Sequence, residues 1–191
     1  IREVAPTVAA PADAERLDVS GLHVYPGFFD AFSRMGLVEI GAVAATVDTS
    51  ELGTYNPHLS ALTAVHPASE VIPVTRESGI THTLTAPAGG RDGGIPGRAS
   101  LIALDGWTVE EMAIEGSAAM VIQWPTIRTR SFDFATFSIR ETPFADAEKQ
   151  AEKAQGELRD WLDAARHYGQ AVDAGSERLV PDPKLAHLSK I

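Results

Sequence analysis

The clearest hydrophobic pattern in this chain predicts a long amphipathic helix toward its C-terminal end. Thr142 and Pro143 form a start signal, because the fixed φ of proline suits the first helical turn. Apolar residues then recur at steps of three and four: Phe144, Ala147, Ala151, Ala154, Leu158, Trp161, Leu162, Ala165 and Tyr168. Charged residues fill the remaining positions, so we expect one buried stripe and one solvated face.

A helix followed by a strand is predicted between residues 69 and 86. Ser69 is a candidate N-cap for a short helix, and Gly79 suits the left-handed conformation that often follows a helix. The next segment, Ile80–Ala86, alternates apolar and polar residues and is rich in β-branched side chains, which favours a strand.

Shorter apolar segments predict further strands. Leu22–Tyr25 and Phe28–Phe32 are separated by Pro26 and Gly27, so we expect two short strands there. The runs Leu101–Leu104 and Ala118–Trp124 are consistent with buried strands or with short helical pieces. The first 18 residues are rich in alanine and proline, which predicts an extended surface segment.

Composition excludes several classes of protein. The 191 residues include 16 Lys and Arg against 26 Asp and Glu, a net charge of −10, which argues against a nucleic-acid partner. No run approaches the roughly 18 apolar residues of a membrane span, so we expect a soluble chain with no membrane partner, in a compartment that the sequence does not assign. The absence of cysteine excludes disulfides and thiolate metal sites.

Candidate chemistry is sparse. No two of the six histidines have the spacing of a local metal motif, so His82 is either a hydrogen-bonded structural histidine or a ligand or acid–base group. The glycine-rich stretch 89–98 is either a mobile loop or an anion site that uses Arg91 and Arg98. Its spacing matches neither the P-loop nor the dinucleotide fingerprint, and no G-x-S-x-G nucleophile elbow occurs.

The segment from Val24 to Arg34 carries a family resemblance. Its Pro-Gly, two apolar residues and Asp30 resemble the first barrel strand of the metal-dependent amidohydrolases, in which a His-x-His motif follows. Further segments resemble the imidazolonepropionase-like branch, from about Ser20 to the long helix: residues 36–43, Asn56-Pro57, residues 70–74, residues 79–81 and residues 104–107.

The resemblance implies an α/β fold: the first part of an amidohydrolase-type (β/α)8 TIM barrel, preceded by the end of a small β-sandwich. Residues 1–24 would belong to the sandwich and residues 25–191 to the barrel. It also implies a hydrolase in which a metal-activated water cleaves a C–N bond of a cyclic amide or related small molecule. Zinc or another divalent metal is the cofactor that the family implies.

The first strand departs from the family at the metal site. Phe32 and Arg34 stand where the family has its two histidine ligands, and neither a phenyl ring nor a guanidinium can bind a metal. The period of two along a strand would point Asp30, Phe32 and Arg34 to one face, by resemblance the barrel lumen. We therefore name Asp30, Arg34 and His82 as candidate substrate-binding residues, with an ion pair of no functional role as the alternative for Arg34. No residue is assigned as a metal ligand or as catalytic.

A complete barrel of this type takes about 250 residues. A partial barrel leaves unpaired strand edges, so we expect the remainder as a continuation of the chain or as a second polypeptide, and an oligomer overall. The alternative to an enzyme is a catalytically inactive homologue that binds a ligand or stabilises a partner. A third hypothesis is a small anion-binding protein that uses the 89–98 loop.

Overall fold

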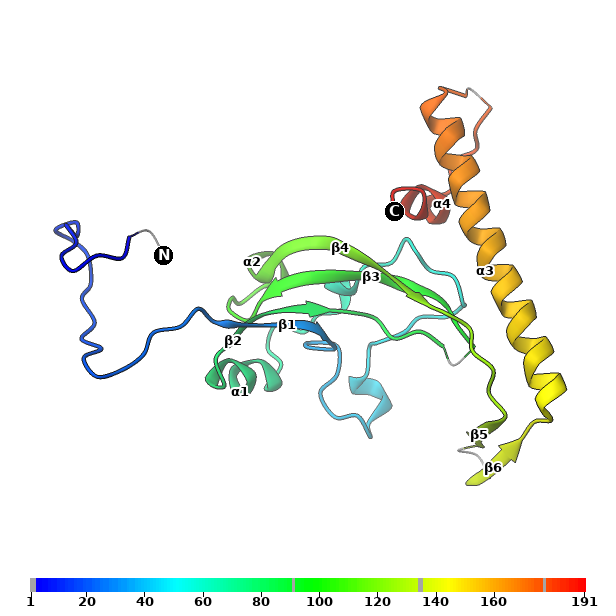
Figure 1. The fold of residues 1–191 in the computed structure, drawn as a ribbon, viewed down its shortest axis with the longest axis horizontal. Coiled ribbons are helices and arrows are strands. Elements are labelled where there is room, and N and C mark those ends of the chain that lie inside the picture. Colours follow the sequence, from blue (N-terminus) through cyan, green and yellow to red (C-terminus); the bar gives the residue numbers. More distant parts are fainter. Residues whose placement is uncertain (1–2, 91, 134–135, 177) are drawn as a thin grey trace.

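The computed structural model describes residues 3–90, 92–133, 136–176 and 178–191. A four-stranded sheet in the order β1-β2-β3-β4 forms its centre (Figure 1). A long helix stands at one end of the sheet, and an extended N-terminal segment leaves from the other end. No helix among the described residues is both long enough and apolar enough to cross a membrane.

The first two strands are parallel. β1 (Phe28–Ser33) pairs with β2 (Ile80–Thr85), and the crossover between them contains the short helix α1 (Val71–Glu77). The predicted helix, strand and Gly79 turn are confirmed, and Gly79 has φ +85°. The N-cap position is Glu70 rather than Ser69, although the Ser69 hydroxyl accepts a hydrogen bond from the Val71 amide at 3.3 Å.

The next two strands are antiparallel. β3 (Gly94–Ala103) pairs with β2, and β4 (Ala113–Gln123) pairs with β3 after a one-turn helix, α2 (Val109–Met112). The two apolar runs that begin at Leu101 and Ala118, for which strand and helix were both open, therefore lie in strands. The eight residues between β2 and β3, 86–93, are too few for a crossover helix, so the chain turns back instead of adding another parallel strand.

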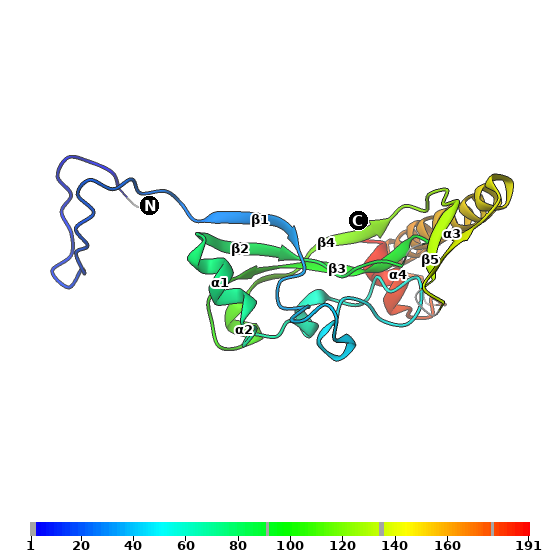
Figure 2. The same cartoon turned by 90° about the horizontal axis from the view of Figure 1, so that it is seen from below.

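One face of the sheet is covered and the other is open. Thr83, Thr85, Ser100, Ile102 and Leu104 are all fully buried on the covered face. They lie beneath a hydrophobic cluster built from the 34–79 crossover and α2: Leu37, Ala61, Val65, Ile72 and Met112. Figure 2 shows α1, α2 and the crossover on this side, with no element over β1 and β2 on the other side.

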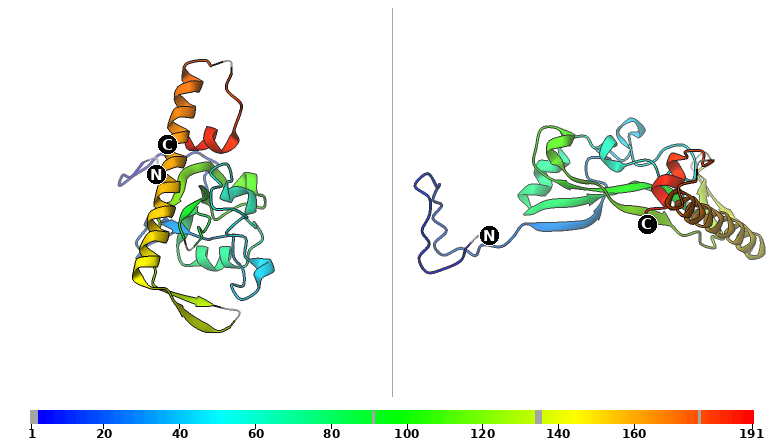
Figure 3. Two further views of the ribbon diagram at one scale, coloured as in Figure 1. Left: turned by 90° about the vertical axis from the view of Figure 1, so that its right-hand side faces the viewer. Right: turned by 90° about the horizontal axis from the view of Figure 1, so that it is seen from above.

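The C-terminal part begins with a hairpin, β5 (Arg130–Asp133) and β6 (Ser138–Glu141), and continues into α3 (Phe144–Asp173). The predicted long helix is confirmed and extends five residues beyond Tyr168. α4 (Pro183–Leu188) folds back against α3 (Figure 3), where Leu158, Ala165 and Leu188 form a second buried cluster with Ile95.

Three sequence expectations are corrected. Leu22–Tyr25 is not a strand, because residues 3–27 are exposed and contain no strand; their assignment to a sandwich stays a prediction. The 89–98 stretch is not simply a loop, because Gly94 opens β3. The described strands form an open mixed sheet rather than the expected run of parallel strands, so no complete barrel is present in this part of the chain.

Candidate functional site

The register of β1 decides which candidate residues share a face. Asp30 pairs with Thr83 and Ser33 pairs with Thr85, so three steps along β1 match two steps along β2. This bulge puts Asp30 and Ser33 on the same, covered side of the sheet. Phe32 precedes Ser33 in β1 and therefore lies on the open side, whereas Arg34 follows the last residue of β1. The expectation that Asp30 shares a face with Phe32 is wrong, because the bulge interrupts the period of two.

His82 lies on the open side as well. It pairs with Phe29 and precedes the buried Thr83, so alternation places it opposite the core. It is half-buried, and its Nδ1 shares a hydrogen bond with the Thr81 hydroxyl at 2.8 Å. The fold thus places His82 on the open face and Asp30 on the covered face.

Asp30 has a local structural partner. Its carboxylate accepts a hydrogen bond from the Phe32 amide at 3.2 Å, which closes the backbone around the bulge. Arg34 is exposed, and none of the ion pairs among the described residues involves Arg34 or Asp30. The ion pair named as the alternative for Arg34 therefore does not form with Asp30 in the described part of the chain.

The residues at the end of β1 do not fit the metal that the resemblance implies. Phe32 is 64% exposed and offers no lone pair, and Arg34 carries a permanent positive charge. Across the ranges that the structure describes, no group of three or more His, Asp or Glu side chains is arranged to hold a metal ion.

The structure describes the proposed anion loop, residues 89–98, except for residue 91. Arg91 lies outside the described residues. Arg98 is half-buried in β3, where its guanidinium donates to the His58 carbonyl at 2.9 Å and to the Leu59 carbonyl at 3.4 Å. Arg98 therefore holds the 55–59 loop against the sheet.

A basic cluster that the sequence did not reveal surrounds this loop. Burial is the main cause that lowers the pKa of His58, and the charges of Lys184 and Arg98 lower it further. Burial likewise lowers the pKa of His187, followed by the charges of Arg98, Lys190 and His58. The Nδ1 of His58 is buried without a hydrogen-bond partner among the described atoms. No sequence signal links these groups, since β3, α4 and the 55–59 loop meet only in the fold.

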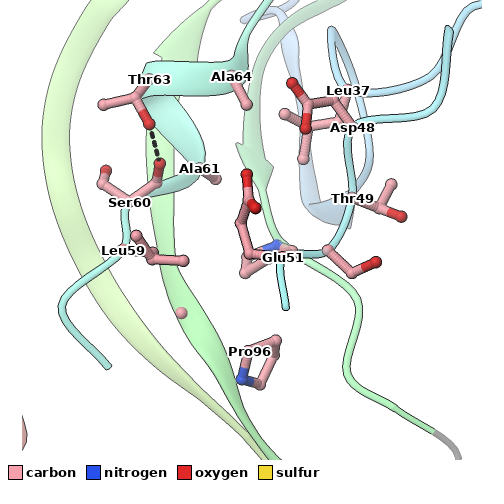
Figure 4. A pocket seen from close by; sticks show the side chains of 13 residues that line it. Leu37, Asp48, Thr49, Glu51, Leu59, Ser60, Ala61, Thr63, Ala64 and Pro96 are labelled. Atoms are coloured by element: carbon pink, nitrogen blue, oxygen red, sulfur yellow. Dashed lines mark hydrogen bonds between the residues drawn. The ribbon is translucent and has the colours of Figure 1, made fainter. Parts of the chain in front are cut away.

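The structure also contains a pocket that the sequence did not predict. It lies on the covered side of the sheet, has a cavity volume of about 60 Å³, and is lined mainly by the crossover and the start of β3. Figure 4 shows the carboxylates of Asp48 and Glu51 facing the space beside Ala61 and Leu37. Its lining residues are spread from position 37 to position 97, so no short motif could have indicated it.

Comparison with known proteins identifies one solved structure of similar fold. It is an amidohydrolase from Thermotoga maritima MSB8, with a TM-score of 0.74 and 25% sequence identity over 99% of this chain. No family model matches the sequence, and no curated protein matches it. The chain spans 48% of the length of that amidohydrolase. The similarity supports an amidohydrolase relationship.

Proposed function

We propose that this chain forms the first part of an amidohydrolase-like protein of the imidazolonepropionase-like branch. In its complete form this protein would hydrolyse a C–N bond in a cyclic amide or related small molecule that carries a negative charge. The observation that carries the proposal is the structural similarity to an amidohydrolase over 99% of this chain. The resemblance of residues 24–34 to the first barrel strand of the same family supports it independently.

In this proposal β1 binds substrate instead of metal. Arg34 is exposed directly after the end of β1, and its permanently charged guanidinium can hold a carboxylate through two parallel hydrogen bonds. His82 lies on the open face and would contact the substrate as a hydrogen-bonding group. Asp30 would act indirectly, because its carboxylate accepts from the Phe32 amide and shapes the bulge that precedes Arg34.

β1 contributes no metal-dependent step, because Phe32 and Arg34 offer no ligand atoms. The groups that activate water would therefore come from the remainder of the protein. That remainder would also cover the open face, on which the large apolar side chain Phe29 is 52% exposed. Parallel strands are nearly always covered on both faces, so we expect further polypeptide to cover the open face of β1 and β2. We propose a continuation of the chain or a second polypeptide in this role.

The test uses the complete polypeptide, whose length is first established by intact mass. Turnover is measured on cyclic amides in matched pairs, with and without a carboxylate, while bound metal is quantified. We expect turnover of the carboxylate member, and Arg34→Gln should raise its KM by about tenfold to a hundredfold through loss of a charge-assisted interaction. Arg34→Lys should recover part of this loss, because it restores the charge without the planar fork.

Arg178→Gln is the matched control, since it removes an exposed arginine from the loop between α3 and α4. It should leave KM unchanged. Equal KM values for wild type and Arg34→Gln would contradict the role of Arg34. The absence of any turnover would contradict the hydrolase proposal.

The second candidate is a non-catalytic homologue that binds the same class of molecule or stabilises a partner. The observation that favours it is the replacement of both expected metal ligands by Phe32 and Arg34. Calorimetry separates the two candidates. Carboxylate binding that depends on Arg34, together with no turnover and no bound metal, would support the second candidate over the first.

A further inference from the structure

We propose that three hydroxyl groups on the covered side of the sheet position Arg34 for binding a carboxylate. They belong to Ser33, Thr83 and Thr85. The inference rests on the proposed function, because it concerns the residue that would bind the substrate there. It adds that β2 sets the direction in which Arg34 leaves the sheet, through threonine side chains that are themselves too buried to touch a substrate.

Arg34 opens a tight turn directly after β1. The Leu37 amide donates to the Arg34 carbonyl at 3.0 Å, so residues 34–37 form a four-residue turn. Gly36 has φ +76° at the third position, and a Cβ there would come within 2.9 Å of the Val65 side chain. The backbone that carries the Arg34 side chain therefore follows one well-defined path.

Thr85 fixes this turn from the neighbouring strand. Its hydroxyl donates to the Met35 carbonyl at 2.8 Å, and the amide of the next residue, Ala86, donates to the Ser33 carbonyl at 2.9 Å. These two bonds hold the residues on both sides of Arg34. Since Thr85 is 0% exposed, its hydroxyl meets no competing water there.

A second connection runs from the turn to the bulge of β1. The Met35 amide donates to the Ser33 hydroxyl at 3.2 Å, and the Ser33 and Thr83 hydroxyls share a hydrogen bond at 2.6 Å. The Thr83 hydroxyl also donates to the Asp30 carbonyl at 3.3 Å. Because each hydroxyl has a single proton, all three bonds form together only when Ser33 donates to Thr83. The turn and the bulge are thus joined by one continuous chain of hydrogen bonds.

Packing alone does not require these hydroxyl groups. Thr83 and Thr85 are both 0% exposed beneath the main hydrophobic cluster, where valine has nearly the same shape and no polar atom to bury. A buried hydroxyl is unfavourable unless it is hydrogen-bonded, so the threonines contribute the direction of their bonds more than burial. Both hydroxyls donate to backbone carbonyls within residues 30–35, the segment that contains Arg34.

A fixed backbone makes binding by Arg34 more favourable. The Arg34 side chain is exposed, and binding a carboxylate through its planar fork costs the conformational entropy of a long side chain. Less freedom is lost on binding when the backbone beneath this side chain is already ordered. The effect should therefore appear in KM and not in kcat, because the groups that activate water would come from the remainder of the protein.

The first measurement is hydrogen exchange in the complete polypeptide, followed by mass spectrometry of the peptides that span residues 33–37. It compares wild type with Thr85→Val, which removes the hydroxyl at nearly constant volume, and with Thr85→Ser, which keeps it. Thr85→Val should speed exchange in these peptides about tenfold, and Thr85→Ser should retain most of the protection. This measurement needs no substrate.

The second measurement tests the link to Arg34 with the carboxylate-bearing cyclic amide. Thr85→Val should raise KM about threefold to tenfold with kcat unchanged, and Thr85→Ser should recover most of this loss. In an Arg34→Gln background, Thr85→Val should raise KM no further, because the group on which it acts is gone. A purely structural role of Thr85 would raise KM equally in both backgrounds.

Ser100→Ala is the matched control. Ser100 is 0% exposed, pairs with Thr85 across β2 and β3, and donates its hydroxyl to the Gly116 carbonyl at 2.9 Å. Its loss should lower stability without changing KM or the exchange of residues 33–37. If Thr85→Val does not fold, Ser33→Ala removes the second connection at a half-buried position and should change exchange and KM in the same way.

Unchanged exchange at residues 33–37 in Thr85→Val would overturn the inference whatever the activity. An equal KM for wild type and Thr85→Val, or the same rise in KM without Arg34, would overturn it too. Absence of turnover in the wild type would contradict the hydrolase alone, and calorimetric binding of the carboxylate by the same variants would then decide the inference. A wild type that binds no carboxylate would overturn both.

Discussion

At the scale of single residues, neighbours outside the local sequence set the chemistry of a side chain. His58 and His187 belong to segments far apart in the chain, yet each is affected by Arg98 and by a lysine near the end of the chain. Lys184 also donates to the Tyr55 carbonyl at 2.8 Å, which ties α4 to the same loop. Asp182, the N-cap of α4, acts in the opposite direction and raises the pKa of His58. Burial and the neighbouring positive charges therefore favour the neutral form of both imidazoles by lowering their pKa values.

This arrangement predicts how stability depends on pH. Because the pKa values of His58 and His187 are lowered from 6.5 in the folded state, the unfolded chain binds more protons in the range just below pH 6.5. The free energy of unfolding should therefore be greatest above pH 6.5 and fall as the pH decreases below it. Denaturant titrations from pH 5 to pH 8 measure this slope, and His58→Gln with His187→Gln should flatten it.

His23→Gln is the matched control, since His23 lies in the exposed segment before β1. It should leave the slope unchanged. A double variant with the same pH dependence as the wild type would contradict the assignment.

At the scale of elements, two glycines differ in whether their position could accept a side chain. Gly94 opens β3 with φ +120°, and a Cβ there would collide with the Thr54 carbonyl, to which the Ile95 amide hydrogen-bonds at 2.9 Å. Gly156 lies inside α3, where a Cβ would meet no atom within 4 Å. The first glycine is required by close backbone contact, and the second only weakens a helix.

Replacing each glycine by alanine should therefore have opposite effects. Gly94→Ala should lower the free energy of unfolding by more than about 1 kcal/mol, since it strains the backbone and separates β3 from residue 54. Gly156→Ala should raise it by about 0.4–1 kcal/mol through helix propensity and a less flexible unfolded chain. Thermal and chemical unfolding of both variants measure the difference. A stabilising Gly94→Ala would contradict the register at the start of β3.

At the scale of the whole molecule, the open face of the sheet is the main surface that no other element covers. Phe28, Phe29 and Phe32 of β1 are 66%, 52% and 64% exposed, which is unusual for a strand with a parallel neighbour. β1 and β4 also stand at the two edges of the sheet, where backbone groups lack a further strand. These features support the proposal that further polypeptide covers this face.

The 191-residue chain should accordingly bind an apolar fluorescent dye, and Phe29→Ser with Phe32→Ser should reduce that binding. Leu17→Ser with Leu22→Ser is the matched control, because both leucines are exposed in the N-terminal segment. The complete polypeptide should bind much less dye than the 191-residue chain. Equal dye binding by the two proteins, or no effect of the phenylalanine changes, would contradict a covered face.

The sequence by itself predicted what depends on local periodicity. The apolar stripe of α3 and the Gly79-to-strand transition were confirmed because helix and strand periods are properties of neighbouring residues. The family resemblance of residues 24–34 likewise needed no coordinates, and the similarity to an amidohydrolase supports that relationship.

Only the tertiary structure decided which side chains meet. The register shift after Asp30 placed Asp30 and Phe32 on opposite faces, although both lie on β1, because one extra residue reverses the side chains that follow it. The antiparallel return of β3, the basic cluster around His58 and the pocket beside Glu51 each depend on segments distant in sequence. Such contacts arise when whole elements pack to bury their apolar faces, and no local pattern along the chain encodes their partners.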